Sequence, residues 1–142
     1  MPISGGWQTY STQDPDYTES AAPPVVNTYY DSTTLINARI YNILCAVEDT
    51  DETLEVRIVV DGHTIPPLAF AATHSTEYAC KIQNYVLTDT QAVIIEAAHT
   101  DISELKGYLC EGNSIVVSIR QTTDTGDGIL KLLVDWGQLT NA

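Results

Sequence analysis

The clearest hydrophobic pattern in the chain is a strict alternation over residues 54–60. Apolar residues occupy every even position from Leu54 to Val60, and the charged residues Glu55 and Arg57 lie between them. Because side chains alternate across a strand, this pattern predicts a strand with one apolar face and one mainly polar face. Asp61-Gly62 follows and supplies the positive φ that a tight hairpin turn needs. We therefore expect a β-hairpin whose outward-facing Glu55 and Arg57 carry no chemistry.

We expect the returning strand to end at Pro66-Pro67, because proline has no N–H to donate to a strand ladder. Residues 33–47 are rich in apolar residues on both parities. Such a segment is typical of a central strand, or of a long strand shared between two contacts. Further strands are expected over residues 78–87, 92–97, 115–121 and 129–136, with the last two forming a second antiparallel hairpin.

The one helical signal lies over residues 101–109, where Asp101 can cap a helix and Glu104 follows three residues later. Gly107 limits this element to one or two turns, or to a structured loop. Seven or eight short strands, with turn signals between them and no helical pattern, favour an all-β fold. We predict an antiparallel β-sandwich or jelly-roll-like domain over residues 31–142.

Residues 1–30 show no sustained period of two or of 3.6. We interpret them as an extended N-terminal arm, with a disordered tail as the alternative. A solvated tail is usually poor in aromatic residues, whereas aromatic rings anchor interfaces. We therefore predict that the arm docks on a neighbouring subunit or partner through its aromatic residues, which are Trp7, Tyr10, Tyr17, Tyr29 and Tyr30.

The excess of acidic residues limits the kinds of partner that the chain can bind. The chain has 142 residues, of which 44% are hydrophobic, and 6 basic against 19 acidic residues give a formal net charge of −13. This charge opposes binding to nucleic acid and to anionic membranes, and it favours solubility, cations or a basic protein surface. A halophilic source is another origin of the same balance. No apolar run is long enough to span a membrane, and no signal peptide is recognisable, so we expect synthesis in a cytoplasm.

Catalytic and metal-binding patterns are not recognisable. Cys45, Cys80 and Cys110 lie in or beside apolar runs and are expected to be buried free thiols, with a disulfide or an intersubunit bond as the alternative. The histidines have no ligand spacing, and we expect His63 to be exposed beside its hairpin turn while His74 and His99 lie in loops. With no nucleophile elbow and no phosphate loop, we predict a protein that is not an enzyme and has no cofactor.

Two acidic segments leave alternatives open. Residues 48–53 could bind calcium through their carboxylates, but they lack EF-hand spacing, and a solvated turn explains them. Residues 124–128 could also form a cation-binding loop, but a hairpin loop whose Asp and Gly serve the backbone conformation explains them. The aromatic residues of the sandwich also allow two interpretations. They could stack on a sugar ring if they shared one face, or they could fill the core or a subunit interface; they are Tyr78, Tyr85, Tyr108 and Trp136.

An extended arm followed by a compact sandwich, with last strands that read Asn113–Arg120 and Ile129–Gly137, resembles small virion proteins of tailed bacteriophages. Capsid decoration (cement) proteins and related head or tail accessory proteins are of this kind. The resemblance implies a homotrimer on the capsid surface of the virion, made in the host cytoplasm. It would clamp neighbouring major capsid protein subunits through the arm and one end of the sandwich. The alternative function is a carbohydrate- or receptor-binding module of a phage tail or head fibre.

Overall fold

The computed structural model describes residues 9–48, 53–71, 80–82, 85–87, 91–96, 109–122 and 128–140. These residues form strands and connections, and no helix able to cross a membrane is found among them. The strands are β1 (Tyr10–Thr12), β2 (Asp16–Glu19), β3 (Tyr30–Asp31), β4 (Leu35–Val47), β5 (Thr53–Val60), β6 (His63–Ala71), β7 (Cys80–Ile82), β8 (Tyr85–Leu87), β9 (Gln91–Glu96), β10 (Cys110–Gln121) and β11 (Leu130–Leu139).

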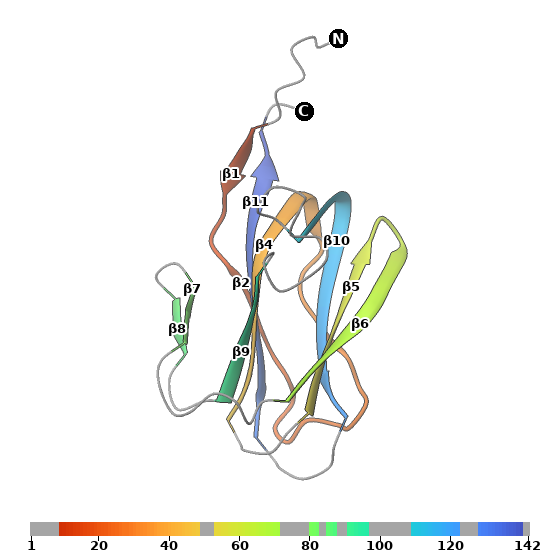
Figure 1. The fold of residues 1–142 in the computed structure, drawn as a ribbon, viewed down its shortest axis with the longest axis vertical. Helices are drawn as coiled ribbons and strands as arrows, with labels where there is room; N and C mark the ends of the chain where they lie inside the picture. The colour runs from red at the N-terminus through yellow and green to blue at the C-terminus, as the bar shows by residue number, and fades with distance from the viewer. Residues whose placement is uncertain are drawn as a thin grey trace.

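The long strand β4 joins two layers of antiparallel strands (Figure 1). Its first half pairs with β10, from Leu35 opposite Ile115 to Ile40 opposite Cys110. Its second half pairs with β9, and β11 lies along its other edge. The apolar residues on both parities of β4 therefore face neighbours on every side, which confirms the prediction of a central, shared strand.

The two layers enclose one apolar core. One layer contains β3, the first half of β4, β10, β5 and β6, and the other contains β9, the second half of β4, β11, β1 and β2. The inward-facing residues of β4, β5, β10 and β11 form a single buried cluster. The predicted all-β antiparallel sandwich is confirmed.

A second, smaller cluster lies on the outer face of the β4–β11 layer. Leu44, Ala46 and Leu133 are fully buried there, although they point away from the main core. Leu87 of the β7–β8 hairpin packs against them. The hairpin thus covers part of an outer face that would otherwise expose apolar side chains to water.

The hairpin of β5 and β6 turns at Asp61-Gly62, as predicted, with φ values of 50° and 82°. The prediction that Pro66-Pro67 ends the ladder is wrong, because β6 continues to Ala71. The register shifts here, so that the two prolines face Arg57 alone. β6 lies at the edge of the sheet, and a bulge there accommodates residues without N–H donors. Pairing can therefore resume after the prolines.

The predicted second hairpin of residues 115–121 and 129–136 is also wrong. These residues belong to β10 and β11, which do not pair with each other because β4 lies between them. The chain instead crosses from one layer to the other between Gln121 and Leu130. Alternating residues specify the buried face of each strand but not its neighbours, so sequence proximity was a poor guide here.

The N-terminal segment is extended, as predicted, and three parts of it are strands of the same sheet. β1 and β2 pair with β11, and β3 pairs with β10. From Tyr10 onwards, therefore, the segment predicted as a separate arm over residues 1–30 is hydrogen-bonded to the sandwich predicted over residues 31–142. Trp7 and the possible helix over residues 101–109, except Leu109, lie outside the described residues.

Candidate functional site

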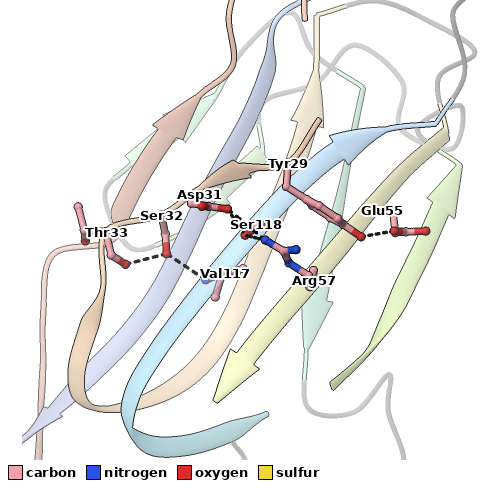
Figure 2. Close-up of polar contacts among 8 residues, drawn as sticks. All are labelled: Tyr29, Asp31, Ser32, Thr33, Glu55, Arg57, Val117 and Ser118. Carbon is pink, nitrogen blue, oxygen red and sulfur yellow. Dashed lines mark hydrogen bonds and ion pairs between the residues drawn. The ribbon is translucent and has the colours of Figure 1, made fainter. Parts of the chain in front are cut away.

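A cluster of polar side chains lies on the outer face of the sheet, where β3 and the residues before it cross β10 and β5 (Figure 2). Strand alternation directs Arg57 of β5, together with Ser118 and Arg120 of β10, away from the core. Tyr29 lies across both guanidinium groups, with its ring centroid 3.9 Å from Arg57 Cζ and 4.5 Å from Arg120 Cζ. Tyr29 is therefore held by two cation–π contacts on the outer face of the sheet.

The Tyr29 hydroxyl donates a hydrogen bond to the Glu55 carboxylate, and Arg120 Nη2 lies 2.6 Å from Glu55 Oε1. Burial, followed by this hydrogen bond, raises the pKa of Tyr29 above its ordinary value. Glu55 thus joins the tyrosine to one of the arginines beneath it. We call this arrangement, in which a tyrosine stacks on an arginine and both bind one glutamate, a Tyr–Arg–Glu cluster.

Next to Tyr29, the backbone of β3 is fixed by buried hydroxyl groups. Ser118 is fully buried, and its hydroxyl donates to Asp31 Oδ1 while Arg57 Nη2 lies 3.4 Å from Ser118 Oγ. The Ser32 hydroxyl accepts a hydrogen bond of 3.0 Å from the Val117 N–H. These contacts replace part of a regular ladder, and they hold residues 29–32 against β10.

A second Tyr–Arg–Glu cluster fixes β1. Tyr10 donates from its hydroxyl to Glu111 Oε2 at 3.0 Å, and Arg39 Nε and Nη2 donate to the same oxygen at 3.1 and 2.9 Å. Arg39 Cζ lies 4.0 Å from the centroid of the Tyr10 ring. Two tyrosines of the N-terminal segment are therefore attached to the sandwich in the same way. Each ring stacks on an arginine, and each hydroxyl donates to a glutamate.

The five aromatic residues predicted as partner contacts have different positions. Tyr10 and Tyr29 lie in the two Tyr–Arg–Glu clusters, Tyr30 packs against the main core, and Trp7 lies outside the described residues. Tyr17 of β2 remains 42% exposed, which leaves its ring available to a partner. Burial, followed by the charge of Glu19, raises the pKa of Tyr17 to about 12.

Sequence reasoning did not identify the arginines and glutamates of these clusters. It placed Glu55 and Arg57 on the outer face correctly, but assigned them no partner. A usable signal was present, because the chain has only 6 basic residues. Arg39, Arg57 and Arg120 all lie within predicted strands, where a charged side chain needs a partner on the same face.

The cysteines and histidines that the structure describes are not assembled into a site. Cys45 is a buried free thiol, as predicted, and Cys110 is free and half-buried; burial raises the pKa of each to about 12. His63 is exposed beside its turn, also as predicted. No group of metal-ligating side chains occurs within the described ranges. The side chain of Cys80, the histidines His74 and His99, and most of the loop 124–128 lie outside the description.

Comparison with known proteins gives little further guidance. No family model matches the chain, and no curated protein matches it. Among solved structures it is similar to one described as "Carbohydrate-Binding Module CBM36 in complex with calcium and xylotriose", with 12% sequence identity and a TM-score of 0.33 over 94% of this chain and 99% of that chain. A similarity at this level assigns no ligand to the present protein.

Proposed function

We propose that this protein is a structural, non-enzymatic virion protein that binds the capsid surface as a decoration protein. The observation that carries the proposal is the junction of the two described chain ends. Thr140 donates from its backbone N–H and its hydroxyl to the Thr9 carbonyl, at 2.9 and 3.0 Å. Thr9, which follows Trp7 by two residues in the sequence, is thus fixed beside the end of β11.

Charge supports a protein surface as the partner. Four of the 6 basic residues are used in ion pairs within the chain, which are Arg39–Glu111, Arg57–Asp31, Arg120–Glu55 and Lys131–Glu48. The remaining acidic excess favours a basic protein surface over nucleic acid or anionic lipid. In this proposal the major capsid protein supplies that surface, and a homotrimer multiplies a modest contact by symmetry.

The pairing of residues 10–31 dictates how the proposal is tested. Removing residues 1–30 would delete β1, β2, Tyr30 of β3 and both tyrosines of the Tyr–Arg–Glu clusters, so lost binding would be ambiguous. Removing residues 1–8 leaves every described contact in place. We expect this shorter variant to keep its circular dichroism and melting temperature, and to lose binding to particles that lack the protein. Full occupancy by the shorter variant would refute the role of this end.

Tyr17 offers a matched pair of variants for the same binding assay. Tyr17→Ala removes a ring that is 42% exposed on β2, and Tyr85→Ala removes one that is 40% exposed on β8. If the β2 side contacts the capsid, only Tyr17→Ala reduces occupancy. Sedimentation of the free protein tests the trimer separately, against a monomer mass of 15.5 kDa.

The exposed rings of Tyr17 and Tyr85 also favour a second candidate, a carbohydrate-binding module of a phage fibre. Aromatic rings that remain open to solvent on a sandwich can stack on the apolar face of a sugar. This candidate requires saturable binding on a glycan array that both Tyr17→Ala and Tyr85→Ala reduce. Binding to particles without any glycan affinity would favour the decoration protein.

A further inference from the structure

Residues 9–20 follow the edge of β11 that faces away from β4. Backbone hydrogen bonds of 2.9 Å join Thr140 to Thr9, Gln13 to Trp136, and Ser20 to Leu130. The paired residues of β1 and β2 occupy the intervals between them. The segment is thus an added outer strand along the whole of β11 (Figure 1), held by its backbone and by side-chain bonds of Tyr10, Asp16 and Ser20.

This outer strand contributes little apolar burial. Pro15 is its one buried residue, and six of its twelve residues are exposed. The main core, to which β11 contributes Leu130, Leu132 and Val134, contains no residue from 9–20. Because apolar burial is the main stabilising term in folding, the core can persist while this strand detaches.

A short connection separates the outer strand from the fixed part of the N-terminal segment. Residues 21–23 are exposed, whereas Pro24 is buried and its carbonyl accepts a hydrogen bond from Gln121 Nε2 at 3.4 Å. Beyond it, Asn27 donates to the Gln121 carbonyl, and Tyr29 lies in its Tyr–Arg–Glu cluster. Movement of residues 9–20 about residues 21–23 breaks the bond from Tyr10 to Glu111 and the two hydrogen bonds that Asp16 accepts from Thr33, at 3.3 and 2.7 Å, whereas the contacts of Tyr29 stay in place.

We propose that residues 9–20 are an exchangeable strand, and that in oligomers of this protein they complete the β11 edge of a second copy. The second copy offers the same edge, so each backbone hydrogen bond and the Tyr10 cluster re-form between chains. A hinge of three exposed residues favours exchange, because a short hinge restricts return onto the same chain. When copies exchange this strand around a closed ring, the β11 edge of every copy is paired. The proposal concerns contacts between copies and does not depend on capsid binding.

A cross-strand disulfide tests the exchange directly. Glu19 lies opposite Lys131, and the neighbouring Ser20–Leu130 hydrogen bond makes 19 and 131 a non-hydrogen-bonded pair, in which Cα atoms lie about 4.5 Å apart. The variant E19C/K131C is oxidised with diamide, which accepts the two hydrogens of the thiol pair. In a closed monomer the bond forms within one chain. After exchange it joins two chains, and a non-reducing gel then shows species at multiples of 15.5 kDa.

We expect the interchain fraction to rise with protein concentration before oxidation. Inserting four Gly and Ser residues between Ala21 and Ala22 lengthens the hinge and should lower this fraction several-fold. Tyr10→Phe removes the bond to Glu111 from the closed and the exchanged arrangement alike, so it should speed the approach to equilibrium several-fold without changing the final interchain fraction. Thiol oxidation unrelated to exchange is measured with two kinds of control. These are the single variants E19C and K131C, and the pair V59C/V116C, whose positions lie opposite each other in β5 and β10. Intrachain bonds alone at every concentration would overturn the proposal.

A second measurement uses the unmodified full chain, in case the cysteine variant folds poorly. A fluorescent peptide of residues 9–20 is added to the wild-type protein, and its anisotropy is followed. If the strand exchanges, the peptide displaces residues 9–20 of the chain and binds with saturation. The same peptide with Thr18→Pro lacks the backbone N–H of residue 18. That N–H lies two residues before the Ser20 N–H, which bonds to Leu130, so binding of this peptide should be lost. Equal anisotropy with both peptides would contradict the exchange.

Discussion

Arg57 lies beneath Tyr29, with its Cζ atom 3.9 Å from the centroid of the tyrosine ring. The contact joins the segment before β3 to the outward face of β5, across the intervening strand β10. Tyr29 also binds Glu55, and Glu55 pairs with Arg120. One tyrosine thus attaches the N-terminal segment to two strands that are distant from it in sequence.

Substitution of Tyr29 should separate the two parts of this attachment. Tyr29→Phe keeps the ring and removes the hydrogen bond to Glu55, which should lower the free energy of unfolding by about 1 kcal/mol. Tyr29→Leu also removes the cation–π contacts and should cost a further ~1–2 kcal/mol. Urea unfolding at neutral pH measures both values. Tyr85→Phe, at an exposed ring, serves as the control and should change stability by less than about 0.5 kcal/mol.

The turn at Asp61 should be sensitive to loss of its side-chain acceptor. Asp61 Oδ1 accepts hydrogen bonds of 2.9 Å from the N–H groups of Asn113 and Ser114, which fixes the hairpin tip to β10. Asp61→Ala removes this acceptor and places alanine at a φ of 50°, so we expect a loss of about 1–3 kcal/mol. Asp61→Asn retains an oxygen acceptor and tolerates the same φ. Equal loss in both variants, measured by thermal unfolding, would rule out the acceptor as the cause.

Gly112 should not accept a side chain. A Cβ atom at this position would lie 2.5 Å from Val60 Cγ1 and 3.0 Å from Asp61 Oδ2. Gly112→Ala should therefore destabilise the fold by about 1–3 kcal/mol through overpacking. In the double variant Gly112→Ala/Val60→Ala the principal clash is removed. A double-mutant cycle measured in urea should show coupling of about 1 kcal/mol, whereas additive losses would contradict this explanation.

The buried thiol of Cys45 should contribute to loss of stability at alkaline pH. Burial raises its pKa from 9.0 to about 12, so the folded state favours the neutral thiol. Its stabilising contribution is complete below pH 9 and is lost as the pH rises from 9 towards 12. In Cys45→Ala the fall in unfolding free energy above pH 9 should be less steep by about 1.4 kcal/mol per pH unit. Parallel profiles of variant and wild type would show that this thiol does not titrate on unfolding.

Local sequence patterns were sufficient to predict which faces of the strands are buried. The alternation from Leu54 to Val60 and the pair Asp61-Gly62 specify a hairpin, because side-chain direction and positive φ are properties of neighbouring residues. The apolar residues on both parities of β4 predicted a strand with neighbours on both sides. These features follow from short-range geometry and from the transfer of apolar surface out of water.

Only the tertiary structure decided which strands are neighbours and what the polar residues do. β4 separates β10 from β11, and a bulge carries β6 past Pro66-Pro67. Tyr10 and Tyr29 contact arginines that are distant in sequence, and no local pattern predicts these contacts. Because a strand edge accepts any complementary backbone, its partner is selected by the packing of the whole sandwich. For the same reason, whether residues 9–20 complete their own β11 or that of a second copy is decided by the assembled fold.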